Sequence, residues 1–308
     1  MYKFLLVPLA SLALFAQEPI TPIPENIVYE KAKAELGKKL FFDKELSKDG
    51  KLACVSCHDV TNNGADTKSY SKGSDGKELG VNTPTIFNSA LNSSFFYDGR
   101  VLDRKKQVEI SIESPNELDN TVDAITNRLI QSTEYKKMFD AIYPDSVTKD
   151  NLLDAIAEFE KALSTPNSKF DIYLRGDTTV LSSEEKKGYE KFISTGCINC
   201  HNGVNVGGNM YQKMGVFIPY TQDKILNGRI DVTKRDRDKF VYKVPSLRNI
   251  AKTAPYMHDG QVKTLKEAIK SMREHQLGVV TNSKSIEQIE IFLHTLTGQT
   301  PAILKEEK

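Results

Sequence analysis

Two copies of the five-residue motif CxxCH, at residues 54–58 and 197–201, contain all four cysteines of the 308-residue chain. In this motif two thiols add to the vinyl groups of a c-type haem, and the adjacent histidine binds the iron from one face. A CxxC pair can also form a zinc site or a redox disulfide, but a four-cysteine zinc site would leave both adjacent histidines unexplained. The sequence therefore predicts two covalently bound haems. Their attachment residues and iron ligands are Cys54, Cys57, His58, Cys197, Cys200 and His201.

The remaining iron ligands distinguish an electron carrier from a catalyst, because an open position on haem iron can bind a small reactant. Between His58 and His201 there is no other histidine, and Met138 has the helical, aromatic surroundings of a core residue. The residue types thus predict an open first haem and a second haem closed by methionine, a pair of ligands that suits electron transfer. The second half offers four candidates for that role: Met210, Met214, Met257 and Met272.

The segments around the motifs have helical patterns. Apolar residues recur at helical spacing over residues 148–163, and helices are expected over 29–42 and 184–194, before the two haem motifs. Convincing period-two strands are scarce. The expected fold class is mostly α, with two cytochrome c-like domains that each carry one covalent haem, and with long loops between short helices. Capping boxes are expected at three helix starts: Ser182/Glu185, Thr264/Glu267 and Ser285/Gln288.

Residues 1–16 have the features of a secretory signal peptide, namely Lys3, a short apolar run and the small residue Ala16. The run is too short to span a bilayer comfortably. We therefore expect a periplasmic mature chain without stable membrane insertion. The formal net charge of +1 gives no general attraction for nucleic acid. A boundary at Thr165-Pro166 would divide the mature chain into an N-terminal domain, 17–165, and a C-terminal domain, 166–308.

Several segments, taken in order, resemble the bacterial di-haem cytochrome c peroxidases, to which the MauG-type enzymes are related. The resemblance extends from about Leu36 to about Gly298. Its carriers in the first half are LGKKLFFDKELSKDGKLACVSCH, GVNTPTIFNSALNSSFFYDGR, Gln107 and SPNEL; in the second half they are KVPSLRNIAKTAPYMHDG and SMREHQLG. The resemblance implies reduction of hydrogen peroxide to water, with electrons from a small soluble cytochrome c or a copper protein. The family often forms homodimers, so a homodimer is also expected.

The resemblance assigns roles to individual residues. His58 would bind the peroxidatic haem, and His201 with Met272 would bind the electron-transfer haem. Met257 falls at a position where the family varies. Glu117 and Gln107 match the polar pair above the peroxidatic haem, where Glu117 would act as general acid and base and Gln107 would orient the peroxide.

The resemblance also implies a calcium ion between the haems, bound by Asn82 and the backbone carbonyls of Thr253 and Pro255. Oxygen ligands of this kind suit Ca²⁺. In many family members a histidine blocks the peroxidatic iron until the other haem is reduced, and Ser74 stands at that position here. Because a hydroxyl is a poor ligand for haem iron, we expect an open haem that needs no reductive activation. Tyr97 replaces the tryptophan that the family has between the haems.

Two other functions remain open. A di-haem electron-transfer cytochrome would have two six-coordinate irons. A MauG-like enzyme would oxidise a protein substrate through tryptophans and would replace the axial methionine with tyrosine, whereas this chain has Met272 and no tryptophan. Arg248 would either bind a haem propionate or form an ordinary ion pair. His258 would have a structural or propionate-side role, and His275 and His294 are expected at the surface or packed.

Overall fold

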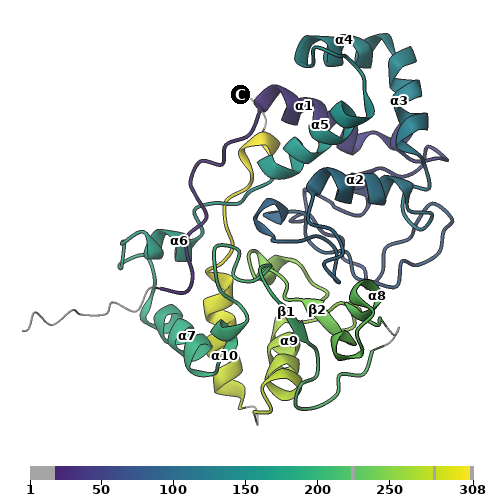
Figure 1. Cartoon of the computed structure of the whole chain (residues 1–308). Coiled ribbons are helices and arrows are strands. Elements are labelled where there is room, and N and C mark those ends of the chain that lie inside the picture. Colours follow the sequence, from purple (N-terminus) through teal and green to yellow (C-terminus); the bar gives the residue numbers. More distant parts are fainter. Residues whose placement is uncertain (1–17, 223–225, 280–281, 306–308) are drawn as a thin grey trace, which may run out of the picture.

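The computed structural model describes residues 18–222, 226–279 and 282–305, so the predicted signal peptide lies outside the described residues. Within these ranges the chain forms mostly helices joined by long loops, and one two-stranded sheet (Figure 1). This confirms the mostly α fold class. The helices are α1 (Lys31–Phe42), α2 (Arg104–Glu113), α3 (Val122–Gln131), α4 (Thr133–Ile142), α5 (Lys149–Ala162), α6 (Lys169–Leu174), α7 (Ser183–Ser194), α8 (Ile230–Thr233), α9 (Leu265–Ser271) and α10 (Ser283–His294), and the strands are β1 (Tyr211–Lys213) and β2 (Val241–Lys243).

The first half is built on α1 and α5, which lie side by side (Figure 1). Both helices are close to the ranges that their apolar spacing predicted, and Thr148 caps α5 by accepting a bond from Asn151 N at 3.2 Å. Their close approach depends on Gly37, because a Cβ there would lie 1.9 Å from the carbonyl oxygen of Ala155. Met138 packs against the same core, as expected.

The second half is built on α7 and α10, which cross at Gly188. An aromatic cluster of Phe170, Tyr189, Phe192 and Phe292 fills the contact. The capping boxes Ser182/Glu185 and Thr264/Glu267 are confirmed.

The predicted cap of α10 at Ser285 is wrong. The helix begins at Ser283, and its cap is Asn282, whose Oδ1 accepts a bond from the backbone N–H of Ser285 at 2.7 Å. Asparagine is as good an N-cap as serine. Because Asn282 lies three residues earlier, Ser285 falls within the first turn.

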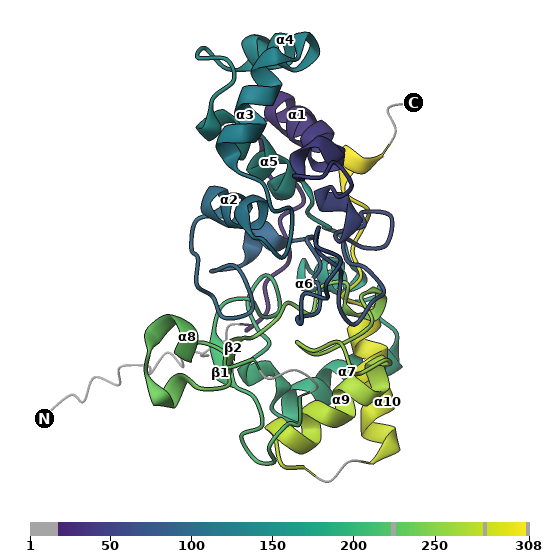
Figure 2. The same ribbon diagram turned by 90° about the vertical axis from the view of Figure 1, so that its right-hand side faces the viewer.

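Each end of the described chain runs from one half of the molecule to the other (Figure 2). Near the N-terminus, Ile20 and Ile23 are buried in the second half, where Ile23 N–H donates to Asp171 Oδ1 at 3.1 Å. Near the C-terminus, Ile303 is buried in the first half and its carbonyl accepts a bond from Lys38 Nζ at 2.7 Å. Each half therefore completes its packing with residues from the far end of the chain. The domain boundary at Thr165-Pro166 stays a prediction.

An internal repeat relates residues 84–101 to residues 245–262. Both segments have the pattern Pro-x-x-x-Asn followed later by Asp-Gly-x-Val. In both, the asparagine is left-handed, with φ of 60° at Asn88 and 61° at Asn249. Both then close a corner with one isolated bridge: Phe95 with Val101, and Tyr256 with Val262.

Thr165 joins the two copies of this repeat. Its Oγ1 accepts a bond from Asn88 Nδ2 at 2.7 Å and another from Asn249 Nδ2 at 2.9 Å, and all three residues are buried. The backbone of Thr165 is hydrogen-bonded to the same asparagine, since Thr165 N–H donates to Asn88 Oδ1 at 2.8 Å. One hydroxyl thus places the two corners relative to each other.

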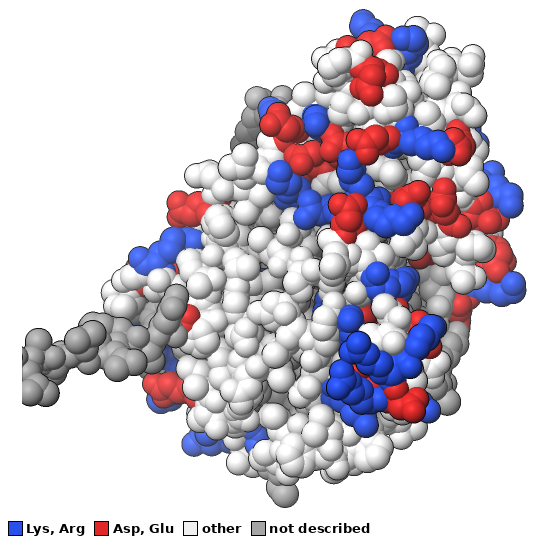
Figure 3. Space-filling model, viewed as in Figure 1, with Lys and Arg blue, Asp and Glu red and all other residues white. Residues whose placement is uncertain are grey.

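The surface carries mixed charge, and acidic and basic side chains are interspersed over the helical part of the first half (Figure 3). Exposed basic residues gather beside α8, among the exposed acids Asp231 and Asp236 (Figure 3). These basic residues are Lys234, Arg235, Arg237 and Lys239. No described helix combines the length and the apolar character that a bilayer crossing requires.

We predict that Thr165→Val destabilises the protein by about 2–4 kcal/mol, because two buried amide groups lose their acceptor while the side-chain shape is kept. Urea unfolding of the haem-loaded protein, followed by far-UV circular dichroism, measures this change. Thr178→Val, at an exposed position, is the matched control. A loss no larger than that of the control would contradict the role of Thr165.

Candidate functional site

Both haem motifs have the same local geometry. Each opens a short 3₁₀ helix, Cys54–Ser56 or Cys197–Asn199, and each histidine N–H donates to the carbonyl of the first cysteine at 3.0 Å. All four thiols are free. No group of three or more Cys, His, Asp or Glu side chains converges on a metal-sized point in the part of the chain that the structure describes. This arrangement fits haem, whose sulfur attachments lie at the ring edge and whose iron lies at its centre, and it gives no support to a zinc site.

The two motif histidines are held neutral, which is the form that binds iron. Burial lowers the pKa of His58, and its Nδ1 lies 3.4 Å from the carbonyl oxygen of Gly64. Burial lowers the pKa of His201 to about 4, and the backbone carbonyls of Val206 and Pro245 counter this only in part. At His58 a carbonyl at one ring nitrogen orients the imidazole and leaves the other nitrogen for a metal, whereas His201 Nδ1 is buried and makes no hydrogen bond to any described residue.

Helix α2 and the loop after it bring Gln107 and Glu117 together. Gln107 Nε2 donates to Ser111 Oγ at 3.2 Å, one helical turn away. Burial raises the pKa of Glu117, and the Ser111 hydroxyl, the positive charge of Arg100 and the Ser114 hydroxyl, in decreasing order, partly oppose this rise. Ser111 therefore links both predicted catalytic side chains. Our sequence reasoning missed it, although its spacing of four residues from Gln107 placed it on the same helical face.

This polar cluster lies beside the first haem motif. The charge of Glu117 acts on the thiols of both Cys54 and Cys57 and raises their pKa values, after the larger effects of burial at both and of Glu160 at Cys54 and Asp66 at Cys57. The structure thus places the predicted acid and base near the predicted peroxidatic haem.

The loop that carries Ser74 packs on the Glu117 segment. Ser74 N–H donates to the carbonyl of Glu117 at 3.1 Å. The approach is so close that a Cβ at Gly73 would lie 1.7 Å from the carbonyl oxygen of Asn116. Ser74 Oγ is buried and has no partner among the described residues. The loop therefore places a small hydroxyl next to the segment of Glu117, the predicted acid–base residue.

Met272 begins a π-helix, Met272–Gln276, that directly follows α9. Short π-helical segments occur frequently at functional sites. This segment lies beside the second haem motif, since Leu277 Cδ2 is 4.0 Å from the position of a Cβ on Gly196 and the charge of Arg273 lowers the pKa of Cys197 against the effect of burial. Met257, in contrast, lies at a left-handed corner with φ of 67°.

A strap formed by residues 213–218 holds the π-helix. Gln276 Oε1 accepts a bond from Gly215 N–H at 3.1 Å, and its Nε2 donates to the Lys213 carbonyl at 2.8 Å. The carbonyl of His275 accepts bonds from Phe217 and Ile218, and His275 Nδ1 lies 3.0 Å from the Ile218 carbonyl. The oxygen and the nitrogen of the Gln276 carboxamide therefore both form hydrogen bonds to the strap. His275 is packed against the same strap, as expected.

Five rings form a continuous aromatic column between the two halves. Tyr97 lies 6.1 Å from Tyr242, and Tyr242 stacks on His258 at 4.4 Å. Tyr220 then lies 5.7 Å from His258 and 5.3 Å from His275, on the π-helix. The column thus connects the Tyr97 corner with the segment that carries Met272. Sequence reasoning missed Tyr220 and Tyr242, because only the folded chain brings these distant loops together.

The expected calcium ligands lie in neighbouring loops. Asn82 N–H donates to the His258 carbonyl at 2.9 Å, and its Nδ2 lies 3.0 Å from the position of a Cβ on Gly260, so Asn82 is next to the loop that contains Thr253 and Pro255. Asn82 Nδ2 donates to the carbonyls of Lys68 and Ser69. These bonds use the Nδ2 end of the carboxamide and leave Oδ1 as the end that could bind a cation.

Arg248 forms the ordinary ion pair that was one of its two expected roles. Its side chain is 1% exposed, and its Nη1 lies 2.8 Å from Asp171 Oδ1. Its other N–H groups donate to the carbonyls of Val204 and Thr21 and to Ser168 Oγ. Because these contacts use the whole guanidinium, Arg248 has nothing left for a haem propionate.

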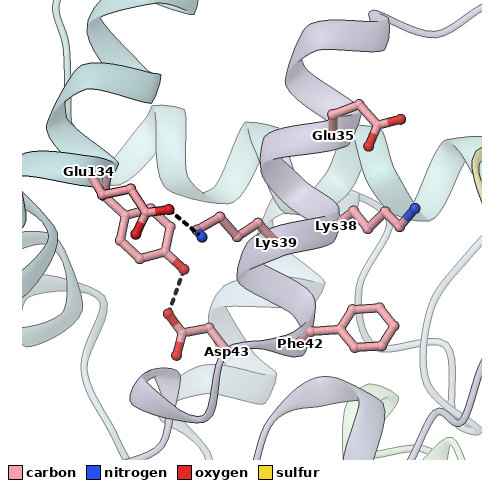
Figure 4. Close-up of a pocket in the computed structure, with 7 residues that line it drawn as sticks. Glu35, Lys38, Lys39, Phe42, Asp43 and Glu134 are labelled. Carbon is pink, nitrogen blue, oxygen red and sulfur yellow. Dashed lines mark hydrogen bonds and ion pairs between the residues drawn. The ribbon is translucent and has the colours of Figure 1, made fainter. Parts of the chain in front are cut away.

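A surface hollow of about 620 Å³ between α1 and α4 is unrelated to these sites (Figure 4). Four of its lining residues are paired with one another: Lys39 Nζ lies 2.7 Å from Glu134 Oε1, and Tyr135 donates to Asp43 (Figure 4). None of its lining residues belongs to a haem motif or to the polar cluster.

Comparisons with known proteins agree with this geometry. A family model described as di-haem cytochrome c peroxidase matches residues 31–179. A cytochrome c551 peroxidase of Nitrosomonas europaea is 43% identical over 287 residues, which are 93% of this chain and 86% of that protein. The cytochrome c peroxidase Ccp of Escherichia coli is 39% identical over 285 residues, which are 91% of this chain and 61% of that protein.

A crystal structure of a MauG-like protein associated with microbial copper homeostasis has a TM-score of 0.79 to this chain, at 26% identity, and the match covers 93% of this chain and 95% of that one. Fold and site together define a di-haem peroxidase. The chain belongs to the di-haem cytochrome c peroxidase family, as the resemblance of its motifs predicted, and it is an enzyme of that family.

We predict that Gln276→Ala speeds hydrogen exchange of the Gly215 amide roughly five- to tenfold, because that amide loses an acceptor worth about 1 kcal/mol. Mass spectrometry of the exchanging protein measures this rate. The Phe217 amide, which is bonded to the His275 carbonyl, should change less, and Gln299→Ala, at an exposed position, should change neither. Equal protection of Gly215 in the variant and the parent would contradict the strap.

Proposed function

We propose that this peroxidase reduces hydrogen peroxide to water beside its first haem motif and receives electrons at its second. Haem, when bound, supplies the iron that holds peroxide and the redox centre that passes electrons. In this proposal each half, 17–165 and 166–308, carries one covalent haem. The observation that supports it best is the separation of functions in space: the Gln107–Ser111–Glu117 cluster lies beside one motif, and the Met272 segment lies beside the other. The residues that hold the haems are Cys54, Cys57, His58, Cys197, Cys200, His201 and Met272.

Glu117 moves the protons. Its carboxylate takes a proton from one peroxide oxygen and returns it to the leaving oxygen, so that H₂O₂, two protons and two electrons give two molecules of water. Burial suits this role, because a carboxyl whose pKa is raised toward neutrality both accepts and donates a proton readily. Gln107 is held by Ser111 through one N–H, and the rest of its carboxamide orients the peroxide.

Electrons reach the second motif from a small soluble cytochrome c or a copper protein in the periplasm. The name of the Nitrosomonas relative, a cytochrome c551 peroxidase, supports a cytochrome donor. The aromatic column from His275 to Tyr97 gives a short route between the two halves. A calcium ion bound by Asn82 and by the carbonyls of Thr253 and Pro255 would tie the loops at this junction, and a homodimer is part of the proposal.

We predict that the fully oxidised enzyme turns over peroxide without pre-reduction, because Ser74 supplies no ligand to the first iron. Stopped-flow mixing of the oxidised protein with peroxide and a reduced cytochrome c measures turnover from the first cycle. The matched variant Ser74→His introduces an imidazole at this position, and its oxidised form should become low-spin at both irons and dependent on pre-reduction. A parent enzyme that shows a lag until it is reduced would contradict the open first haem.

We predict that Glu117→Gln lowers kcat by about 10²–10⁴-fold, because the amide keeps the shape of the carboxyl but cannot carry the proton. Steady-state turnover at saturating donor measures this loss. Glu109→Gln, at a half-buried position on α2, removes the same charge away from the cluster and should leave kcat within about twofold of the parent.

Ser111→Ala tests the same assignment through pH. The base form of Glu117 is present above its pKa and is lost as the pH falls, and the Ser111 hydroxyl lowers that pKa. Its removal should therefore move the acid limb of kcat/KM to higher pH. An unchanged acid limb would argue against Glu117 as the base.

A further inference from the structure

We propose that Arg273 is the buried counter-charge of the second haem, where its guanidinium binds a haem propionate and raises the reduction potential of that haem. The inference rests on the proposed function, which places a haem on the second motif, and it adds a residue that none of the matched motifs assigns. It identifies the ligand as the carboxylate of the haem itself.

Two of the three guanidinium nitrogens of the buried Arg273 are unpartnered in the part of the chain that the structure describes. It is 3% exposed, and neither its Nε nor its Nη1 makes a hydrogen bond to any described residue. No carboxylate of the described chain lies within ion-pair distance of it, whereas Arg248, equally buried, has Asp171 at 2.8 Å and four further hydrogen bonds. An isolated buried charge is strongly unfavourable unless an anion compensates it. The described residues therefore supply no anion to compensate Arg273, and a bound anion is needed there.

The position of Arg273 identifies that anion. The residue follows Met272 in the π-helix, and its positive charge lowers the pKa of the Cys197 thiol. Leu277, which follows the π-helix, lies next to Gly196, the residue before Cys197. The Arg273 cation thus belongs to the pocket of the second haem motif. The nearby acid of the same segment, Glu274, is half-exposed and lies 3.9 Å from Lys270 instead. The anions that a haem brings into a protein are its two propionates, and a guanidinium pairs well with a carboxylate.

A fixed positive charge in this pocket has a defined effect on the haem. Reduction removes one positive charge from the iron, so a nearby cation favours the reduced form. The effect is strong where water is excluded, because a low dielectric weakens screening. Together with a Met/His ligand pair, which also raises the potential, Arg273 would make the second haem a ready acceptor of electrons from a donor protein.

Spectroelectrochemical titration of the haem-loaded enzyme tests this inference with three variants. Arg273→Gln should shift the reduction equilibrium of the second haem at least tenfold toward the oxidised form, which is 59 mV for one electron, and should leave the first haem unchanged. Arg273→Lys, which keeps the charge, should retain most of the parent potential. Lys270→Gln removes the same charge from a side chain that is 58% exposed on the same segment, and should shift neither haem.

An Arg273→Gln enzyme that keeps the parent potential, or an Arg273→Lys enzyme that loses as much as Arg273→Gln, would overturn the inference. The Met–iron absorption band of the ferric protein is recorded in the same samples. If the parent lacks this band, the assignment of Met272 in the proposed function fails, while the potentials still report on Arg273. Failure of the ligand assignment and failure of the counter-charge are therefore distinguishable.

Discussion

The hydroxyl of Thr165 accepts hydrogen bonds from two buried amides, Asn88 and Asn249, and the rest of the haem-binding region is arranged around this joint. Each asparagine begins one copy of the repeated corner, and buried amides must keep their acceptors. Neither corner can move away without exposing an unsatisfied N–H group. The two corners then present Tyr97 and His258 at equivalent positions, on either side of Tyr242. A repeat that is weak in sequence thus becomes a near-symmetric frame for two unlike sites.

The two-stranded sheet connects that frame to the π-helix that begins at Met272. Lys243 N–H on β2 donates to the Tyr97 carbonyl at 2.8 Å, and its Nζ donates to the Ser94 carbonyl at 2.7 Å. Tyr211 on β1 donates to Ser94 Oγ at 2.7 Å. The strap that binds Gln276 begins where β1 ends, at Lys213. A short run of hydrogen bonds therefore joins the Tyr97 corner to the strap that holds the π-helix.

The sequence predicted what depends on neighbouring residues and missed what depends on assembly. Helical spacing and the capping pairs located α1, α5, α7 and α9 to within about two residues, because these signals are local. The predicted N-cap of α10 was wrong because asparagine and serine are equally good N-caps, so local rules do not choose between Asn282 and Ser285. The haem motifs and the Gln107–Glu117 pair were predicted from motifs, and the structure places them together.

Other features could not be predicted in this way. The crossing of the chain ends, the aromatic column and the unpaired state of Arg273 arise only when segments far apart in the sequence meet. Arg248 illustrates the limit, because its type and position allowed a propionate partner, and only the buried Asp171 decides for an ion pair. Ser111 could have been found from its spacing alone.

The two pockets differ most in how they treat charge. Beside the first motif, burial raises the pKa of Glu117, so the charge there is one that a proton can remove. Beside the second, the buried Arg273 supplies a guanidinium cation. A site that exchanges protons with its substrate needs a group that titrates, whereas a site that only passes electrons benefits from a constant field. The asymmetry that the predicted iron ligands suggest is thus repeated in the surrounding side chains, and it supports the proposal of proton chemistry in the first half and electron supply in the second.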